Sequence, residues 1–168
     1  MEKDKGWILR YWPLFALILV ALLGASALAH SVGRSLYAWM HFFMGLFFCQ
    51  FSMLKLFNPA GFASGFQKYD LIAKRFEGYS YFYPLIELGL GLAYLSFVYP
   101  IATYVITIIV MSVGAVGVIR ALREGLDLRC ACMGTVLDVP LSTVTLAEDV
   151  VMGVMAFLML VISRFSAL

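Results

Sequence analysis

The sequence predicts an all-α, polytopic membrane protein: a bundle of five transmembrane helices folded as one domain over residues 1–168. Composition is the first observation, since 63% of the residues are hydrophobic and 13% charged, against about 45–50% and about 25% in soluble domains. Long uncharged runs are the second, because an ionised side chain in hydrocarbon costs at least about 2.5 kcal/mol on insertion scales. At roughly 20 residues per span, a chain of this length allows at most about five or six crossings, with little left for a soluble domain.

The first two predicted spans are residues 11–33 and 35–57. The first follows a short basic segment and contains the small-x-small sequence Ala27-Leu28-Ala29. A cleaved signal peptide shows the same features. We expect it to be retained as an anchor helix, because the numbering begins at Met1. The second span ends in Lys55 and a turn signal, Asn58-Pro59.

The third and fourth spans, 80–98 and 101–119, come from a single long apolar stretch that Pro100 interrupts. Proline disfavours helical geometry in the residue before it, so the stretch predicts a tight helical hairpin. The fifth span, 145–163, has a short charge-free part. Its helix must therefore begin near Thr145 and include two carboxylates in its first turns.

Residues 62–79 predict an amphipathic helix that lies in the membrane interface. Aromatic and aliphatic residues recur there at helical spacing, while the charged residues lie mostly off that stripe. The apolar face is expected to contact lipid. The stripe consists of Phe62, Phe66, Tyr69, Ile72 and Phe76.

Charge distribution predicts the orientation. With the N-terminus inside, ten of the twelve lysines and arginines lie on the cytoplasmic side, all but Arg34 and Arg164. The positive-inside rule then predicts N-terminus inside and C-terminus outside, so the loop 120–144 faces the cytoplasm. The net charge of +2 gives no indication of a nucleic-acid partner. The expected surroundings are the lipid bilayer.

The loop contains the sharpest local motif, Cys130-Ala131-Cys132-Met133-Gly134. Arg129 precedes it and favours the thiolate form, which is the nucleophile in thiol chemistry. Two thiols one residue apart can also converge on a soft ion such as Cu(I) or Zn(II), with Met133 as a third donor. A third possibility is that the two cysteines are incidental.

Two residues inside the spans stand out, Cys49 and Glu87. Cys49 lies six residues before Lys55, about 9 Å along a helix axis. It is either a small buried packing residue or a third reactive thiol. Glu87 is expensive in a membrane and needs a partner, for which Lys55 and Gln50 are the candidates. A purely structural role is equally open, because Gly89 and Gly91 beside it permit close helix contact.

The fifth span begins with polar residues and continues with methionines. Thr145 and Glu148 match a capping box, and Asp149 adds a second acid near the helix start. Three methionines share a face with Glu148, which is typical of packing but also suits passage of a soft metal. They are Met152, Met155 and Met159. Near the outer end of the second span, Tyr37, Trp39 and His41 are expected to form an interfacial aromatic belt.

Taken in order, three stretches resemble the MauE/DoxX-like family of redox-associated bacterial membrane proteins. They are residues 45–62 with Lys55-Leu56-Phe57-Asn58-Pro59, residues 84–91 with Ile86-Glu87-Leu88, and Cys130-x-Cys132-x-Gly134. The resemblance implies a four-helix DoxX-like core to which the first helix is an addition. It further implies a bacterial inner-membrane location and a link to thiol redox chemistry.

Three functions follow. The one we favour, because of the resemblance, is thiol/disulfide exchange or electron passage by the dithiol of Cys130 and Cys132 to a thioredoxin-like partner. The alternative is binding or transport of a soft metal of the Cu, Zn or Hg class, received from a metal-delivering protein and passed along Cys49, Glu87 and the methionines. The third is a non-catalytic accessory subunit. The sequence leaves open whether the protein is an enzyme and whether it forms homo-oligomers.

Overall fold

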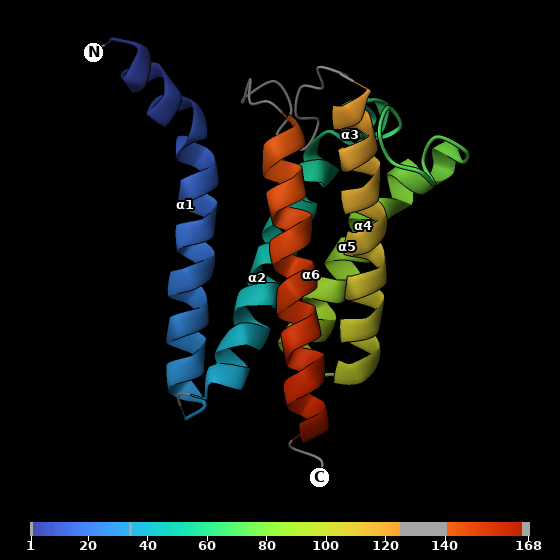
Figure 1. The fold of residues 1–168 in the computed structure, drawn as a ribbon. Coiled ribbons are helices and arrows are strands. Elements are labelled where there is room, and N and C mark those ends of the chain that lie inside the picture. Colours follow the sequence, from blue (N-terminus) through green and yellow to red (C-terminus); the bar gives the residue numbers. More distant parts are fainter. Residues whose placement is uncertain (1, 34, 125–140, 166–168) are drawn as a thin grey trace.

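The computed structural model describes residues 2–33, 35–124 and 141–165, and throughout these residues the secondary structure is helix and turn without a strand (Figure 1). This confirms the all-α prediction for the described part of the chain. The helices are α1 (Glu2–Ser31), α2 (Leu36–Phe57), α3 (Pro59–Phe66), α4 (Glu77–Ser96), α5 (Pro100–Arg123) and α6 (Leu141–Phe165).

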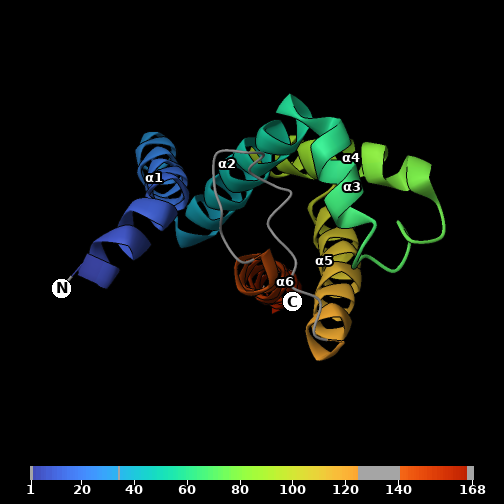
Figure 2. The same ribbon diagram turned by 90° about the horizontal axis from the view of Figure 1, so that it is seen from above.

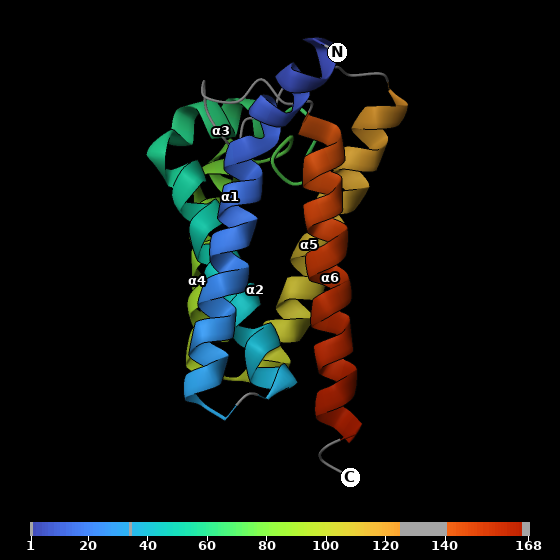
Figure 3. The ribbon, with the colours of Figure 1, turned by 90° about the vertical axis from the view of Figure 1, so that its left-hand side faces the viewer.

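Five of the helices have 20 residues or more and run along the length of the bundle, while α3, with 8 residues, lies at one end (Figure 1). α2 packs against α1 on one side and α4 on the other, and α5 pairs with α6 (Figure 2). The chain begins at one end of the bundle and finishes at the opposite end (Figure 3). The predicted hairpin turns at Phe97 to Tyr99, where Phe97 and Tyr99 have positive φ angles of 56° and 45°.

Four helices are long and apolar enough to cross a membrane: Trp12–Ser31, Leu36–Phe57, Pro100–Arg123 and Thr145–Arg164. Their outward faces carry large apolar side chains such as Leu23, Ile109 and Phe157, as contact with lipid requires. Four of the five predicted spans thus coincide with helices that could cross a membrane, and the count of five stays a prediction. α4 runs beside α2, but Glu87, Pro84 and several tyrosines lower its hydropathy, and these polar groups are largely turned into the protein.

The helix expected over residues 62–79 differs in extent and in environment. α3 ends at Phe66, and the chain continues in turns as far as Arg75. Asp70 explains the break, because its Oδ1 accepts the backbone N–H groups of Ile72 and Ala73 at 2.9 and 2.8 Å and so competes with helical hydrogen bonding. Phe62, Phe66 and Tyr69 are buried in a protein cluster with Tyr83 and Val118. These three side chains pack against α4 and α5, whereas Ile72 and Phe76 at the other end of the stripe are exposed.

α1 joins the bundle through small side chains. Ala21, Ala25 and Ala29 recur every four residues and form its buried face against α2, while Leu19 and Leu23 point outward. Small residues let two helices approach closely within a membrane, where there is little hydrophobic drive for their association. α1 therefore attaches to the remaining helices along one side only.

The contact between α2 and α4 is tighter still. A Cβ atom placed on Gly91 would lie 2.8 Å from Cys49 Sγ and 3.0 Å from the Gly45 carbonyl oxygen. Gly89, by contrast, has no such neighbour within 4 Å. Of the two glycines that the sequence indicated, Gly91 makes the close contact.

We predict that Gly91→Ala lowers the stability of the protein by about 1–3 kcal/mol, because the added methyl meets backbone atoms of α2 that cannot move aside. The matched control is Gly89→Ala, where the space is open and alanine is favoured over glycine in a helix by up to about 1 kcal/mol. Thermal unfolding of the purified protein in detergent measures both. Equal midpoints for the two variants would contradict the prediction.

Candidate functional site: a buried ion pair at the end of the bundle

A buried ion pair joins α2 to α4. Nζ of Lys55, in the last turn of α2, lies 2.5 Å from both carboxylate oxygens of Glu87. The two residues are 3% and 1% exposed. Lys55, one of two candidates from the sequence, is thus confirmed as the partner of Glu87. The other candidate, Gln50, has a buried Oε1 for which the described residues provide no hydrogen bond.

Aromatic rings surround the lysine. Nζ lies 5.1 Å from the ring centroid of Tyr83 and 5.6 Å from that of Phe62, distances at which a cation is attracted to the face of a π-system. Phe62 comes from α3, which Asn58 caps by accepting the Gly61 N–H at 3.0 Å. The short helix therefore serves to place an aromatic wall over the ion pair.

α6 brings two more acids to the same place. Glu148 and Asp149 are buried and, with Thr145 and Gly114 of α5, line a cavity of about 10 Å³ that Lys55 also lines. The capping box expected at Thr145 and Glu148 is wrong, because α6 begins four residues earlier, at Leu141. Both acids consequently sit two turns inside the helix, where capping does not account for them.

Asp70 is a further buried carboxylate at this end of the bundle, and sequence analysis overlooked it. Burial raises its pKa, and the hydrogen bonds from Ala73 and Ile72 act in the opposite direction. A Cβ on Gly117 would lie 2.7 Å from the Tyr69 carbonyl oxygen, so the turn that carries Asp70 is pressed onto α5. The sequence feature that could have indicated a buried acid here is the position of Asp70 at the centre of a strongly aromatic segment.

A second polar network lies toward the other end of α2. His41 Nδ1 is 3.0 Å from the Tyr94 carbonyl oxygen, which only accepts, so Nδ1 is the donor. Nε2 of a neutral ring then accepts from Tyr104 Oη at 2.5 Å, and Tyr104 accepts from Tyr37 Oη at 2.5 Å. His41 is fully buried and stacks on Phe97. The aromatic belt expected for His41 is therefore wrong, because the side chain faces the interior.

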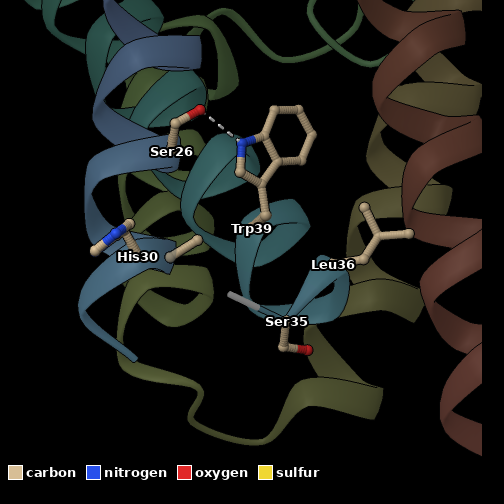
Figure 4. A pocket seen from close by; sticks show the side chains of 6 residues that line it. Ser26, His30, Ser35, Leu36 and Trp39 are labelled. Atoms are coloured by element: carbon tan, nitrogen blue, oxygen red, sulfur yellow. Dashed lines mark hydrogen bonds between the residues drawn. The ribbon is translucent and has the colours of Figure 1, made fainter. Parts of the chain in front are cut away.

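A groove of about 500 Å³ opens between the end of α1 and the start of α2 (Figure 4). Trp39 Nε1 donates to Ser26 Oγ at 3.1 Å across it, and His30 and Leu36 lie on its rim. Among the described residues that line this groove there is no acid, lysine, arginine or cysteine. It is thus separate from the buried charges.

The structure separates the other predicted site residues into two groups. Cys130, Cys132 and Met133 lie outside the described residues. The loop that carries them leaves α5 after Arg123 and enters α6 at Leu141, and both helix ends lie at the end of the bundle where α3 lies (Figure 1). The described residues on either side of the loop therefore lie at the end of the bundle that holds the Lys55–Glu87 ion pair.

The remaining predicted residues are within the bundle. Cys49 is half-buried against Gly91, one helical turn along α4 from Glu87. Met152 and Met159 belong to the hydrophobic core together with Met111, and Met155 packs at its edge. Within the described ranges there is no group of three His, Cys, Asp or Glu side chains suited to a metal ion. Packing accounts for the methionine row.

These features define a class of protein: a multi-pass helical membrane protein with an ion pair and further acidic side chains buried between its helices. The chain belongs to the MauE family, since the family model described as methylamine utilisation protein MauE matches residues 33–162. The match begins just after α1, so α1 lies outside the matched residues. Neither a curated protein nor a solved structure matches the chain. The DoxX-like part of the resemblance stays a prediction.

We predict that Lys55→Met or Glu87→Gln alone lowers stability by about 3–5 kcal/mol, because each removes the opposite charge that the other buried group contacts directly. In the double variant Lys55→Met/Glu87→Met, both charges are gone and most of that loss is recovered. Denaturation of the three variants and the wild type in mixed micelles completes a double-mutant cycle. Additive losses, with no recovery in the double variant, would show that the pair does not act as a unit.

Proposed function

We propose that the protein is a redox-associated accessory protein of the bacterial inner membrane, which exchanges thiols and disulfides with a partner through Cys130 and Cys132. One observation carries the proposal: the MauE family match extends over residues 33–162 and so includes the loop with both cysteines. The description of the family names methylamine utilisation. We infer an accessory role of that kind for this chain.

The chemistry we propose is a two-step exchange. One thiolate of the pair attacks a sulfur of a disulfide in a thioredoxin-like partner, forming a mixed disulfide and releasing the other partner sulfur as a thiolate that takes up a proton. The second thiolate then attacks the mixed disulfide. The products are a Cys130–Cys132 disulfide and a reduced partner, so two electrons pass to the partner, and the reverse sequence reduces the pair.

The surroundings of the loop support this chemistry. Arg120 and Arg123 are exposed in the last turn of α5, immediately before the loop. Positive charge favours the thiolate over the thiol, and therefore the form that attacks a disulfide. The close packing of α5 against α6 holds the two ends of the loop in a fixed relation.

The soft-metal alternative requires the loop cysteines, Met133 and the methionines of α6 to act together. Met152 and Met159 are fully enclosed by core side chains, so the row lines no open path among the described residues. The experiment that tests the thiol function also tests this alternative.

We predict that thiol trapping of cells captures a disulfide or mixed disulfide that the Cys130→Ser/Cys132→Ser variant has lost. The matched control is Cys49→Ser, which keeps both loop thiols and should keep the trapped species. Metal analysis of the protein purified under reducing conditions is run in parallel. A stoichiometric soft metal that disappears in the double variant would overturn the thiol function and establish the metal alternative.

We further propose that the N-terminus faces the cytoplasm and the C-terminus the periplasm, as the basic residues indicate. Lys55, Lys68, Lys74, Arg120 and Arg123 lie in or next to segments at the α3 end, whereas Arg164 lies at the other end of α6. We predict that alkaline phosphatase fused after Leu168 is active and that a cytoplasmic reporter at the same position is not. The opposite result would place the loop cysteines in the periplasm.

A further inference from the structure

We propose that a groove between α5 and α6 is a binding site for a lipid-soluble phenol, whose hydroxyl group donates a hydrogen bond to the Asp149 carboxyl. The site lies in the described part of the bundle. Thiol exchange in the loop does not require it, so the inference goes beyond the proposed function and does not rest on it.

The groove has the size of a ligand site and opens toward lipid. Its volume is about 340 Å³, within the range of about 300–1,000 Å³ that is usual for small-ligand pockets. Val150, Val154 and Phe157, each about half exposed, form its α6 wall. Both helices that border the groove are long and apolar enough to cross a membrane. A ligand therefore reaches the groove from within the bilayer.

One acid interrupts the apolar lining. Asp149 is 5% exposed, and its Oδ2 has no hydrogen-bond partner among the described residues. The carboxyl packs over Gly114 of α5, where a Cβ would come within 2.7 Å of Oδ2, and it also lines the groove. The terminal torsion of an aspartate is soft, so a small rotation turns an oxygen toward the groove. A ligand that brings a donor satisfies an acceptor that is costly to leave unpaired.

The depth of Asp149 excludes the headgroup of an ordinary phospholipid as that donor. Gly114, beneath the carboxyl, precedes Arg120 by six residues, about 9 Å along the helix axis. Arg120 is exposed in the last turn of α5 and marks the level of the membrane surface. From Asp149 the groove continues away from that surface, toward Phe157. The donor therefore belongs to a molecule that dissolves in hydrocarbon, and an uncharged hydroxyl meets this condition better than an ammonium group.

The lining favours an aromatic ring next to that hydroxyl. Phe157 offers an exposed ring for stacking, and Met111 is a thioether residue, a type that makes favourable contacts with ring edges. Gly153 lines the groove without a side chain and so leaves room for a flat ring. The exposed Ser112 can give the phenolic oxygen a second hydrogen bond. These contacts together describe a phenol with an apolar tail.

Photolabelling of the full-length protein in lipid nanodiscs tests the inference. The probe is a phenol whose para-alkyl chain carries a diazirine, and the labelled peptides are mapped by mass spectrometry. We expect saturable labelling within residues 108–115 and 150–157. Unlabelled 4-heptylphenol should compete at least about tenfold better than 4-heptylanisole at equal concentration in the membrane, because the anisole has no O–H group to donate to the carboxyl.

Two pairs of measurements connect the labelling to the groove. Val154→Trp fills the groove and should abolish saturable labelling. The matched control is Val151→Trp, on the same helix and exposed to a similar extent but outside the groove, which should leave labelling unchanged. Asp149→Leu removes the acceptor and should abolish the preference for the phenol over the anisole.

Labelling of the wild type that does not saturate, or equal competition by the phenol and the anisole, would overturn the proposal. Neither result needs a variant to fold. An equal loss of labelling in Val154→Trp and Val151→Trp would overturn it as well. The thiol-trapping result has no bearing on these outcomes, so failure of this inference and failure of the proposed function are distinguishable.

Discussion

The Lys55–Glu87 ion pair is the constraint around which the rest of the bundle is arranged. Neither charge tolerates hydrocarbon alone, so α2 and α4 must meet in the register that brings Nζ to both carboxylate oxygens. One turn further along α4, Gly91 allows the backbones to approach until Cys49 and Gly45 touch it. The close contact at Gly91 brings α2 and α4 near enough for the ion pair to form. Small residues alone would let the two helices slide along each other, and the ion pair selects one register between them.

Enclosing this pair explains the least regular part of the fold. The hydrocarbon of a bilayer provides no hydrogen-bond donors or acceptors. The side of the Lys55–Glu87 pair that α2 and α4 do not cover must therefore be covered by other parts of the protein. α3 and the turn that follows supply Phe62 and Tyr69, and Tyr83 closes the α4 side. Asp70 fixes the turn by binding two backbone N–H groups. Phe62, Phe66 and Tyr69, the first three residues of the aromatic stripe, thus face the protein interior, although the periodicity of the stripe is that of a helix lying on a membrane.

The positions of the helices along the chain could be predicted from the sequence better than the contacts that each helix makes. Uncharged runs, Pro100 and the scarcity of charges were enough for the all-α fold and the approximate spans, because the cost of a charge in hydrocarbon is local and large. Glu87 was recognised for the same reason, and Lys55 was a candidate partner. Tertiary facts were out of reach: that the stripe from Phe62 faces protein, that α6 begins at Leu141, and that His41 turns inward to Tyr104. A hydrophobic pattern shows that a face is buried but not whether lipid or protein buries it.

α2 connects two polar centres that differ in kind. Near its start, His41 has both ring nitrogens satisfied by neutral groups, the Tyr94 carbonyl and the Tyr104 hydroxyl, and this network needs no net charge. Near its end, Lys55 carries a full charge that the Glu87 carboxylate matches at 2.5 Å, and Glu148 and Asp149 of α6 line a small cavity beside it. The neutral network depends on hydrogen-bond geometry alone, whereas the ion pair also depends on both partners keeping their charge, because an uncompensated charge in the interior is costly. The charged centre lies at the α3 end of the bundle, where α5 ends before the loop with Cys130 and Cys132 and α6 begins after it.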